Sequence, residues 1–264
     1  MADKAILFDS SRCTGCKLCQ LSCNAQRGAA PLFEDGAMVR GGTSPFACDD
    51  EGGALLTMEF EERWDEGDSV PFHAAWTRVS CMHCRDAACV RVCPTGAMAV
   101  QQETGLVLND AERCVSCGLC QTVCPFDVPR PAAGEKRIVK CDGCAARLSE
   151  GEEPWCVAAC PADALRFDDR DIVLDEVQQR VAALQERGWE RACVFGATEQ
   201  GGLGVIEVLK LGPDERRGEV LADTGANSTV RVVELVGPVS LGILGLVAIT
   251  GVLTLGYGMK QPRR

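Results

Sequence analysis

The chain has 264 residues and a formal net charge of −11 at pH 7. This length suits one or two domains. The acidic balance argues against nucleic acid as a partner, because phosphates demand clustered Lys and Arg. Aromatic residues make up only 5%, whereas cysteines number 18. We therefore expect metal–ligand bonds to contribute to folding and the metal-free chain to be unstable.

The N-terminus leads directly into the first of four groups of cysteines. Residues 1–8 lack a basic run followed by an apolar core, so no signal peptide is expected. In chain order the groups are Cys13, Cys16, Cys19 and Cys23; Cys81, Cys84, Cys89 and Cys93; Cys114, Cys117, Cys120 and Cys124; and Cys141, Cys144, Cys156 and Cys160. The third group reads C-x2-C-x2-C-x3-C-P, with which bacterial ferredoxins hold cubane clusters, and the others are variants. At four thiolates per cluster, the sequence predicts four 4Fe-4S clusters.

Cysteine at this density has two other uses, disulfides and zinc binding. Disulfide frameworks belong mainly to small secreted domains, whereas this chain is longer and arranges its cysteines in C-x2-C pairs. Zinc ribbons also use C-x2-C pairs, but they need neither a third cysteine soon after the pair nor a proline after the fourth. The pattern therefore favours iron–sulfur clusters.

The segment 24–78 separates the first two groups and is interpreted as an insertion. Alternating residues around 55–59 and 72–79 predict strands within it. Cys48 stands alone in this segment and is more typical of a small buried side chain than of a ligand. His83, between two cluster cysteines, either tunes a cluster through a hydrogen bond or lies in an exposed loop.

The chain repeats itself around the second and fourth groups. Residues 93–98 resemble 160–165, and short β-like runs follow at 99–101 and 166–167. A turn and a second run, 106–108, come after the first of these. Cluster loop, short helix and hairpin in repetition are the layout of a bacterial ferredoxin.

The cysteine groups end before the C-terminal part of the chain. Apolar residues at helical spacing predict a helix over 176–187, with Gly188 as its C-cap. Alternation over 205–211 predicts a strand. Cys193 lies between these elements and is interpreted as a core residue. The polar segment 213–229 is interpreted as a linker.

Residues 235–259 contain no charged side chain over 25 positions. About 20 apolar residues suffice to cross the bilayer core, so this segment predicts a transmembrane helix. Small residues recur every three positions, which favours packing against another membrane subunit. They are Gly242, Gly245, Ala248 and Gly251. The segment holds no histidine, so we expect no haem ligand from this chain within the bilayer.

Flanking charge predicts the orientation of this span. Lys260, Arg263 and Arg264 follow it, so the positive-inside tendency places the C-terminus in the cytoplasm. The cluster-bearing part would then lie on the periplasmic or outer side. Because no export signal is expected, we hypothesise that the chain folds in the cytoplasm and is exported with a partner that carries one.

Together these features resemble the iron–sulfur subunits of membrane-associated molybdopterin oxidoreductases. The shared features are the order of the four groups, the eleven-residue gap in the fourth and the single C-terminal span. Within that class the chain most resembles the β subunit of respiratory formate dehydrogenase. The segments that carry this likeness are 81–84, 151–156, 180–189 and 201–202, and it is weakest over 28–78.

The resemblance implies that the first and fourth groups exchange their last cysteines, as do the second and third. The implied ligand sets are Cys13, Cys16, Cys19 and Cys160 for cluster one; Cys81, Cys84, Cys89 and Cys124 for cluster two; Cys114, Cys117, Cys120 and Cys93 for cluster three; and Cys141, Cys144, Cys156 and Cys23 for cluster four. It also implies an α+β fold of two bacterial-ferredoxin-like halves built from βαβ repeats, plus the C-terminal transmembrane helix.

The implied domain boundaries follow from these sets. One half comprises 1–75 and 138–172, with 24–78 as its insertion, and holds clusters one and four; 76–137 holds clusters two and three; 173–230 is an extension and linker; and 235–259 is the anchor.

The resemblance implies an electron-transfer subunit with no catalytic site of its own. Electrons would pass from a molybdenum- or tungsten-pterin catalytic subunit, which oxidises formate, through the four clusters to a membrane cytochrome b and then to quinone. The same role in a membrane-bound nickel–iron hydrogenase, or in a sulfoxide, polysulfide or tetrathionate reductase, is the nearest alternative. A free ferredoxin-like carrier and a metal-binding scaffold without redox activity are alternatives of other classes.

Overall fold

A computed structural model describes residues 3–25, 33–34, 37–38, 55–64, 72–132, 137–214, 217–218 and 220. All of them belong to one compact unit, Met1–Thr224. Cys48, most of the predicted linker and the predicted span 235–259 lie outside the described residues. Within the described ranges, no helix combines the length and the apolar composition that crossing a bilayer requires.

A four-stranded sheet joins the two ends of the described chain. Its order is β10 (Leu165–Asp169), β1 (Lys4–Asp9), β12 (Val205–Leu209) and β11 (Cys193–Phe195). Strand β1 is antiparallel to β10 and parallel to β12, and β11 is antiparallel to β12. The sheet therefore brings the N-terminal strand beside the strand that follows the last cysteine group. The predicted strands at 166–167 and 205–211 are confirmed.

Strand β1 is buried on both faces because a different core covers each of them. Ala5 and Leu7 point into an aliphatic core shared with helix α6 (Arg170–Glu186). Ile6 and Phe8 point into a second core that contains several of the cysteines. Alternate residues of a strand face opposite sides, so one short apolar run serves both cores.

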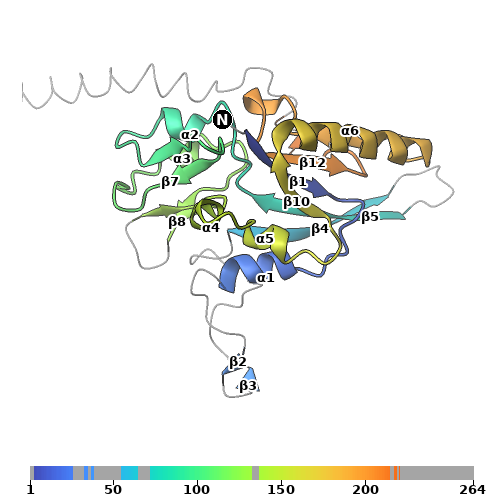
Figure 1. Ribbon diagram of the computed structural model, residues 1–264, viewed down its shortest axis with the longest axis horizontal. Helices are drawn as coiled ribbons and strands as arrows, with labels where there is room; N and C mark the ends of the chain where they lie inside the picture. The colour runs from blue at the N-terminus through green and yellow to red at the C-terminus, as the bar shows by residue number, and fades with distance from the viewer. Residues whose placement is uncertain are drawn as a thin grey trace, which may run out of the picture. The chain divides into compact units, whose positions relative to one another are not determined.

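Helix α6 lies along one face of this sheet (Figure 1). Its buried residues recur at helical spacing. They are Val173, Val177, Val181 and Leu184. The predicted helix is confirmed, but it begins six residues earlier, at Arg170, because β10 runs directly into it.

Gly188 ends helix α6, as the sequence predicts. Its φ of +89° is in the left-handed region, which glycine adopts without penalty. The N–H of Gly188 donates to the Gln185 carbonyl at 2.9 Å, and that of Trp189 donates to the Leu184 carbonyl at 3.1 Å. These two bonds form a Schellman motif, which satisfies carbonyls that the helix end would otherwise leave unpaired.

Two-stranded ribbons make up the rest of the strands. The segment described as an insertion contains the antiparallel pair β4 (Leu56–Trp64) and β5 (Phe72–Ser80), so its predicted strands are confirmed. The pair β6 (Met98–Val100) and β7 (Val107–Asn109) confirms the predicted hairpin. The remaining pairs are β2 (Phe33–Glu34) with β3 (Ala37–Met38), and β8 (Arg130–Pro131) with β9 (Ile138–Val139).

Short helices accompany the cysteine groups. They are α1 (Leu18–Ala25), α2 (Ala88–Arg91), α3 (Leu119–Thr122), α4 (Ala145–Ser149) and α5 (Trp155–Ala158). A 3₁₀ turn, η1 (Glu199–Gly201), precedes β12. Helices of one or two turns are not stable by themselves, so contacts at the cysteine groups must hold them. The mixed helix and strand content agrees with the predicted α+β class.

Candidate metal centres

The first cavity is lined by cysteines from both ends of the described chain. It measures about 330 Å³, including space open to solvent, and Cys13, Cys16, Cys19 and Cys160 line it. The first three belong to the loop between β1 and α1 and to the start of α1, and Cys160 lies between α5 and β10. The pairing of β1 with β10 is what brings these two segments together.

A second cavity of about 380 Å³ is lined by Cys81, Cys84, Cys89 and Cys124. Cys89 belongs to α2, whereas Cys124 follows α3. The two short helices pack against each other. Lys140, Val107 and Phe126 also line this cavity.

Electrostatic contacts group the remaining cysteines into two further sets. The thiol of Cys120 interacts with those of Cys117, Cys114 and Cys93. The thiol of Cys156 interacts with those of Cys141, Cys23 and Cys144. Helices α1 and α5, which carry Cys23 and Cys156, pack together.

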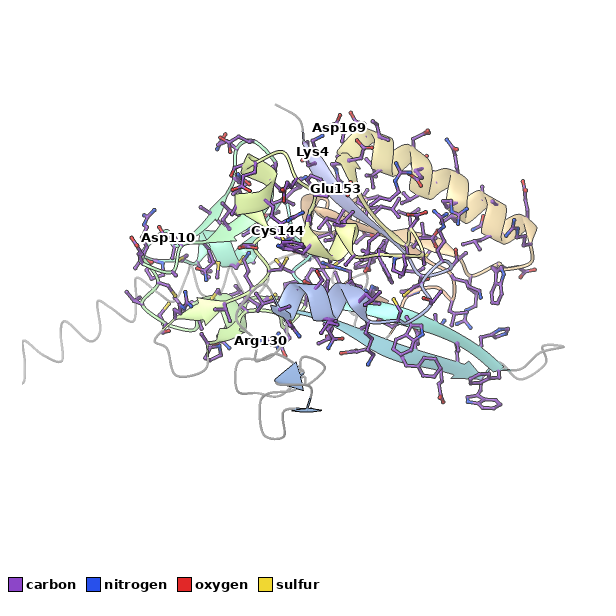
Figure 2. The ribbon with its side chains drawn as sticks, turned by 60° about the horizontal axis from the view of Figure 1, so that its bottom comes forward. Lys4, Asp110, Arg130, Cys144, Glu153 and Asp169 are labelled. Atoms are coloured by element: carbon purple, nitrogen blue, oxygen red, sulfur yellow. The ribbon has the colours of Figure 1, made fainter. Side chains whose placement is uncertain are left out.

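The structure thus brings together each of the four sets that the resemblance implies. Cys144 of the fourth set lies where α4 begins (Figure 2). Lys4 and Asp169 form an ion pair near the start of α6, away from Cys144. Cys193 lies apart from the sets, half-buried against the core beside β12, as expected for a core residue. The role of the sixteen cysteines as ligands stays a prediction.

The donor set fits a multi-iron cluster better than a single ion. Among the residues that the structure describes, no three His, Cys, Asp or Glu side chains are close enough to hold one metal ion. The thiolate sulfur atoms that bind one zinc ion all lie ~2.3 Å from that ion. Four thiols spread around a cavity match a 4Fe-4S cluster, in which four cysteines hold four irons.

Burial keeps several of the metal-free thiols protonated at neutral pH. It raises the pKa of Cys19 to about 11 and that of Cys156 to about 12, although the positive charge of Arg78 opposes both shifts. Burial likewise raises the pKa of Cys89 to about 12, and the nearby thiol of Cys81 adds to this shift. Four thiolates in one apolar cavity therefore require positive charge, which bound iron supplies.

Backbone N–H groups point at several of the sulfur atoms. The N–H of Ile138 donates to Cys114 Sγ at 3.3 Å, and that of Met98 donates to Cys93 Sγ at 3.5 Å. The N–H of Gly143 donates to Cys141 Sγ at 3.4 Å. Hydrogen bonds to sulfur stabilise the thiolate and help set a cluster's potential.

The first cysteine loop depends on a glycine. Gly15 has a φ of +69°, and a Cβ there would lie 2.0 Å from Trp76 Cε2. The Trp76 ring therefore covers the loop so closely that no other residue fits at this position. This contact ties the β4–β5 ribbon to the first cavity.

His83 is buried, so the exposed-loop alternative is wrong. Its side chain is 0% exposed, and its Nδ1 accepts a hydrogen bond from the Val107 N–H at 3.0 Å. Burial, followed by the positive charges of Lys140, Arg78 and Arg85, lowers the pKa of His83 well below its usual value. The imidazole is therefore neutral, and its proton is on Nε2.

Two buried cations close to the cysteines were missed by the sequence analysis. Arg78 is 1% exposed and Lys140 is 3% exposed. Arg78 precedes the second cysteine group by three residues, and Lys140 directly precedes the fourth. A basic residue close to a cysteine group, within a predicted strand, was the available signal for Arg78.

Family comparisons identify the class of protein. The model of a 4Fe-4S dicluster domain matches residues 73–170, and that of a 4Fe-4S binding domain matches residues 10–26. With the cavities lined by cysteines, these matches define a ferredoxin-type iron–sulfur protein that binds 4Fe-4S clusters.

Similarity to named proteins shows which family within this class the chain belongs to. The "Formate dehydrogenase, nitrate-inducible, iron-sulfur subunit" of Escherichia coli (strain K12) is 35% identical over 210 residues, covering 79% of this chain and 68% of the relative. The "Formate dehydrogenase iron-sulfur subunit" of Haemophilus influenzae is 30% identical over 262 residues, covering 97% and 82%. The "Probable anaerobic dimethyl sulfoxide reductase chain YnfG" of Escherichia coli (strain K12) is 35% identical over 181 residues, covering 67% and 77%. The chain belongs to the family of formate dehydrogenase iron–sulfur subunits, which transfer electrons and have no catalytic site of their own.

Proposed function

We propose that this chain carries electrons through four 4Fe-4S clusters, from a molybdenum- or tungsten-pterin subunit that oxidises formate towards a membrane cytochrome b and quinone. The observation that carries the proposal is the grouping of sixteen cysteines into four sets, in each of which one cysteine comes from another group. Such exchange is typical of two-cluster ferredoxins.

A bound 4Fe-4S cluster supplies a one-electron redox centre, and the residues of this chain hold and insulate it. In this proposal the ligand sets are Cys13, Cys16, Cys19 and Cys160; Cys81, Cys84, Cys89 and Cys124; Cys114, Cys117, Cys120 and Cys93; and Cys141, Cys144, Cys156 and Cys23. Apolar neighbours such as Phe8, Met58 and Phe126 exclude water from the first two cavities. Low solvent access is one of the factors that set cluster potentials.

The exposure of the cysteines indicates at which two sets electrons enter and leave this chain. Among the described cysteines, only Cys16 and Cys117 are exposed. They belong to the first and third sets, whereas the second and fourth sets contain only buried or half-buried cysteines. We infer that partner subunits exchange electrons at sets one and three, and that sets two and four lie between them.

The proposed arrangement also includes the domain halves and the anchor. Residues 1–75 with 138–172, and residues 76–137, form the two ferredoxin-like halves, and 173–230 extend the first. The span 235–259 holds the chain to the membrane, with the C-terminus in the cytoplasm and the cluster-bearing part outside. Protease should cut this part in right-side-out spheroplasts and spare it in inverted vesicles. The reverse pattern would contradict the orientation.

Single cysteine variants of the intact complex test the ligand sets. We expect Cys160→Ser to abolish the same EPR signal as Cys16→Ser, and to leave the signal that Cys144→Ser removes. Cys193→Ser is the matched control, because Cys193 is half-buried but lies outside every set. It should keep about sixteen irons per chain, four for each cluster. Loss of the same signal in Cys160→Ser and Cys144→Ser would overturn the proposed exchange.

A second candidate partner is a sulfoxide reductase. The similarity to a probable dimethyl sulfoxide reductase subunit of Escherichia coli supports this candidate. Purification of the intact complex separates the two, because its largest subunit will support formate oxidation or sulfoxide reduction. A nickel–iron subunit in its place would identify a hydrogenase.

A further inference from the structure

Arg78 is a buried cation whose charged group has no hydrogen-bond partner among the described residues. Its side chain is 1% exposed, and Nε, Nη1 and Nη2 all lack an acceptor. It belongs to β5, where it pairs with Met58 of β4. A guanidinium has five N–H donors, so leaving all of them unpaired in the interior is costly unless another group receives them.

Glu207 acts on the charge of Arg78 but forms no hydrogen bond with its guanidinium. Its two carboxylate oxygens accept from Arg217, Oε2 from Nε at 2.5 Å and Oε1 from Nη2 at 2.8 Å. Arg217 Nη2 also donates to the backbone carbonyl of Arg78 at 3.0 Å. The buried carboxylate is therefore committed to Arg217, and the guanidinium of Arg78 stays available.

The other charged neighbours of Arg78 are cysteines. They are Cys156 and Cys141 of the fourth set and Cys19 of the first. Arg78 also acts on Cys81 of the second set, but more weakly than Lys140 does. The positive charge also acts in return on Cys19 and Cys156. Arg78 is therefore close to cysteines of sets one and four.

Lys140 occupies a corresponding position at the second set. It lines the second cavity, and its Nζ donates to the carbonyls of Val107 at 2.5 Å and Cys141 at 2.9 Å. Its charge acts on Cys81 and Cys89, both of that set. The two carbonyls fix the ammonium group in place without neutralising it.

The third set is different. The main interactions of Cys120 are with Cys117, Cys114, Cys93 and its own backbone N–H, and none is with a cation. The described neighbours of this set instead supply N–H donors, from Ile138 to Cys114 and from Met98 to Cys93. Among the described residues, buried positive charge is therefore distributed unevenly over the four sets.

We propose that Arg78 and Lys140 are fixed charges that raise the reduction potentials of particular clusters, Arg78 at sets one and four and Lys140 at set two. This inference rests on the proposed ligand sets. Each cluster gains a negative charge on reduction, and a cation in a poorly screened interior stabilises that charge. Arg78 also presents unpaired N–H groups that can bond to cluster sulfur, which favours the reduced form as well. Set three, at which the described residues place no such cation, keeps a potential independent of both residues.

The test is an anaerobic redox titration of the intact complex, followed by EPR, with iron content measured on the same samples. Each wave is assigned by its loss in Cys16→Ser, Cys89→Ser, Cys117→Ser or Cys144→Ser. We expect Arg78→Gln to lower the equilibrium constants for reduction of sets one and four by about tenfold. This corresponds to reduction potentials lower by about 59 mV for one electron. Lys140→Gln should do the same to set two. Neither change should move set three.

Arg78→Lys separates charge from packing, because it keeps the cation and loses the planar fork. We expect it to retain full iron and to hold the potentials of sets one and four within about twofold of the unmodified equilibrium. This comparison is decisive if Arg78→Gln fails to retain iron. If Arg78→Lys instead shifted the reduction equilibria of sets one and four by about tenfold, the proposed role of the charge would be overturned.

Full iron with unmoved waves in Arg78→Gln and Lys140→Gln would overturn the inference and leave the ligand sets standing. Equal shifts of all four waves in either variant would also overturn it, since a local charge acts mainly on its own neighbours. Failure of the proposed ligand sets looks different, because the unmodified complex would then lack the four assignable waves.

Discussion

The sheet with helix α6 and the segments that carry the cysteines are stabilised by different means. In the first region, β1 and β12 bury Ala5, Leu7, Ile206 and Val208 against four aliphatic residues of α6. In the second region, around α2 and α3, one buried cluster consists of Met98, Cys120 and Ile138, with Val90 and three further cysteines packed against it. The first cluster is mainly aliphatic, whereas cysteines make up much of the second.

The lengths of the elements differ in the same way. Helix α6 has 17 residues, whereas α2 and α3 have 4 each and β6 and β7 have 3 each. One helical turn or a three-residue ribbon is not stable in isolation. We therefore expect hydrophobic burial to stabilise the sheet layer, and iron–thiolate bonds to stabilise the region between β5 and α4.

Removal of iron should separate the two regions most strongly. We expect chelation to lower hydrogen-exchange protection of the α2, β6, β7 and α3 amides by at least about a hundredfold, or ~3 kcal/mol. The amides of α6 and β12 should keep most of their protection. Mass spectrometry of exchanged peptides measures both. Equal loss in the two regions would show that the sheet layer also depends on the clusters.

Substitution in the aliphatic core should have the opposite pattern. Ile206 of β12 is 0% exposed and packs against α6. Ile206→Ala should lower the stability of that layer by about 2–5 kcal/mol. Iron content should stay unchanged. The control is Ile172→Ala on α6, since Ile172 is 49% exposed and its loss should cost less than about 0.5 kcal/mol. Iron loss in Ile206→Ala would mean that the two regions fold as one unit.

Cluster assembly should also depend on pH. Burial raises the pKa of Cys120 to about 11 and that of Cys156 to about 12, so these two metal-free thiols are protonated at neutral pH and must release protons to bind iron. Affinity therefore weakens as pH falls, by up to about tenfold per pH unit for each proton released. Anaerobic loading of metal-free chain with iron and sulfide, followed by absorbance, measures this between about pH 8.5 and 7.5. Loading that is independent of pH would contradict the protonated state of the thiols.

The local elements were predictable because their signals are local. The hairpin β6–β7 follows a Cys-Pro step and a turn, and α6 shows apolar residues at helical spacing up to Gly188. The start of α6 at Arg170 was not predicted, because the direct passage from β10 into the helix leaves no linker residues to mark it. The burial of His83 was also left open, since a loop position alone does not tell which elements will cover it.

The sequence by itself determined the cluster chemistry, the short elements and the family. Two cysteines separated by two residues in one loop can bind the same metal site regardless of how the rest of the chain folds. The resemblance implied which distant cysteines share a set, and only the tertiary structure shows which strand pairing brings them together. Cys160 reaches the first loop because β10 pairs with β1, and β12 completes that sheet in parallel with β1. Likewise Arg78 and Lys140 became visible as buried charges only in the folded chain, because burial depends on neighbours far away in sequence.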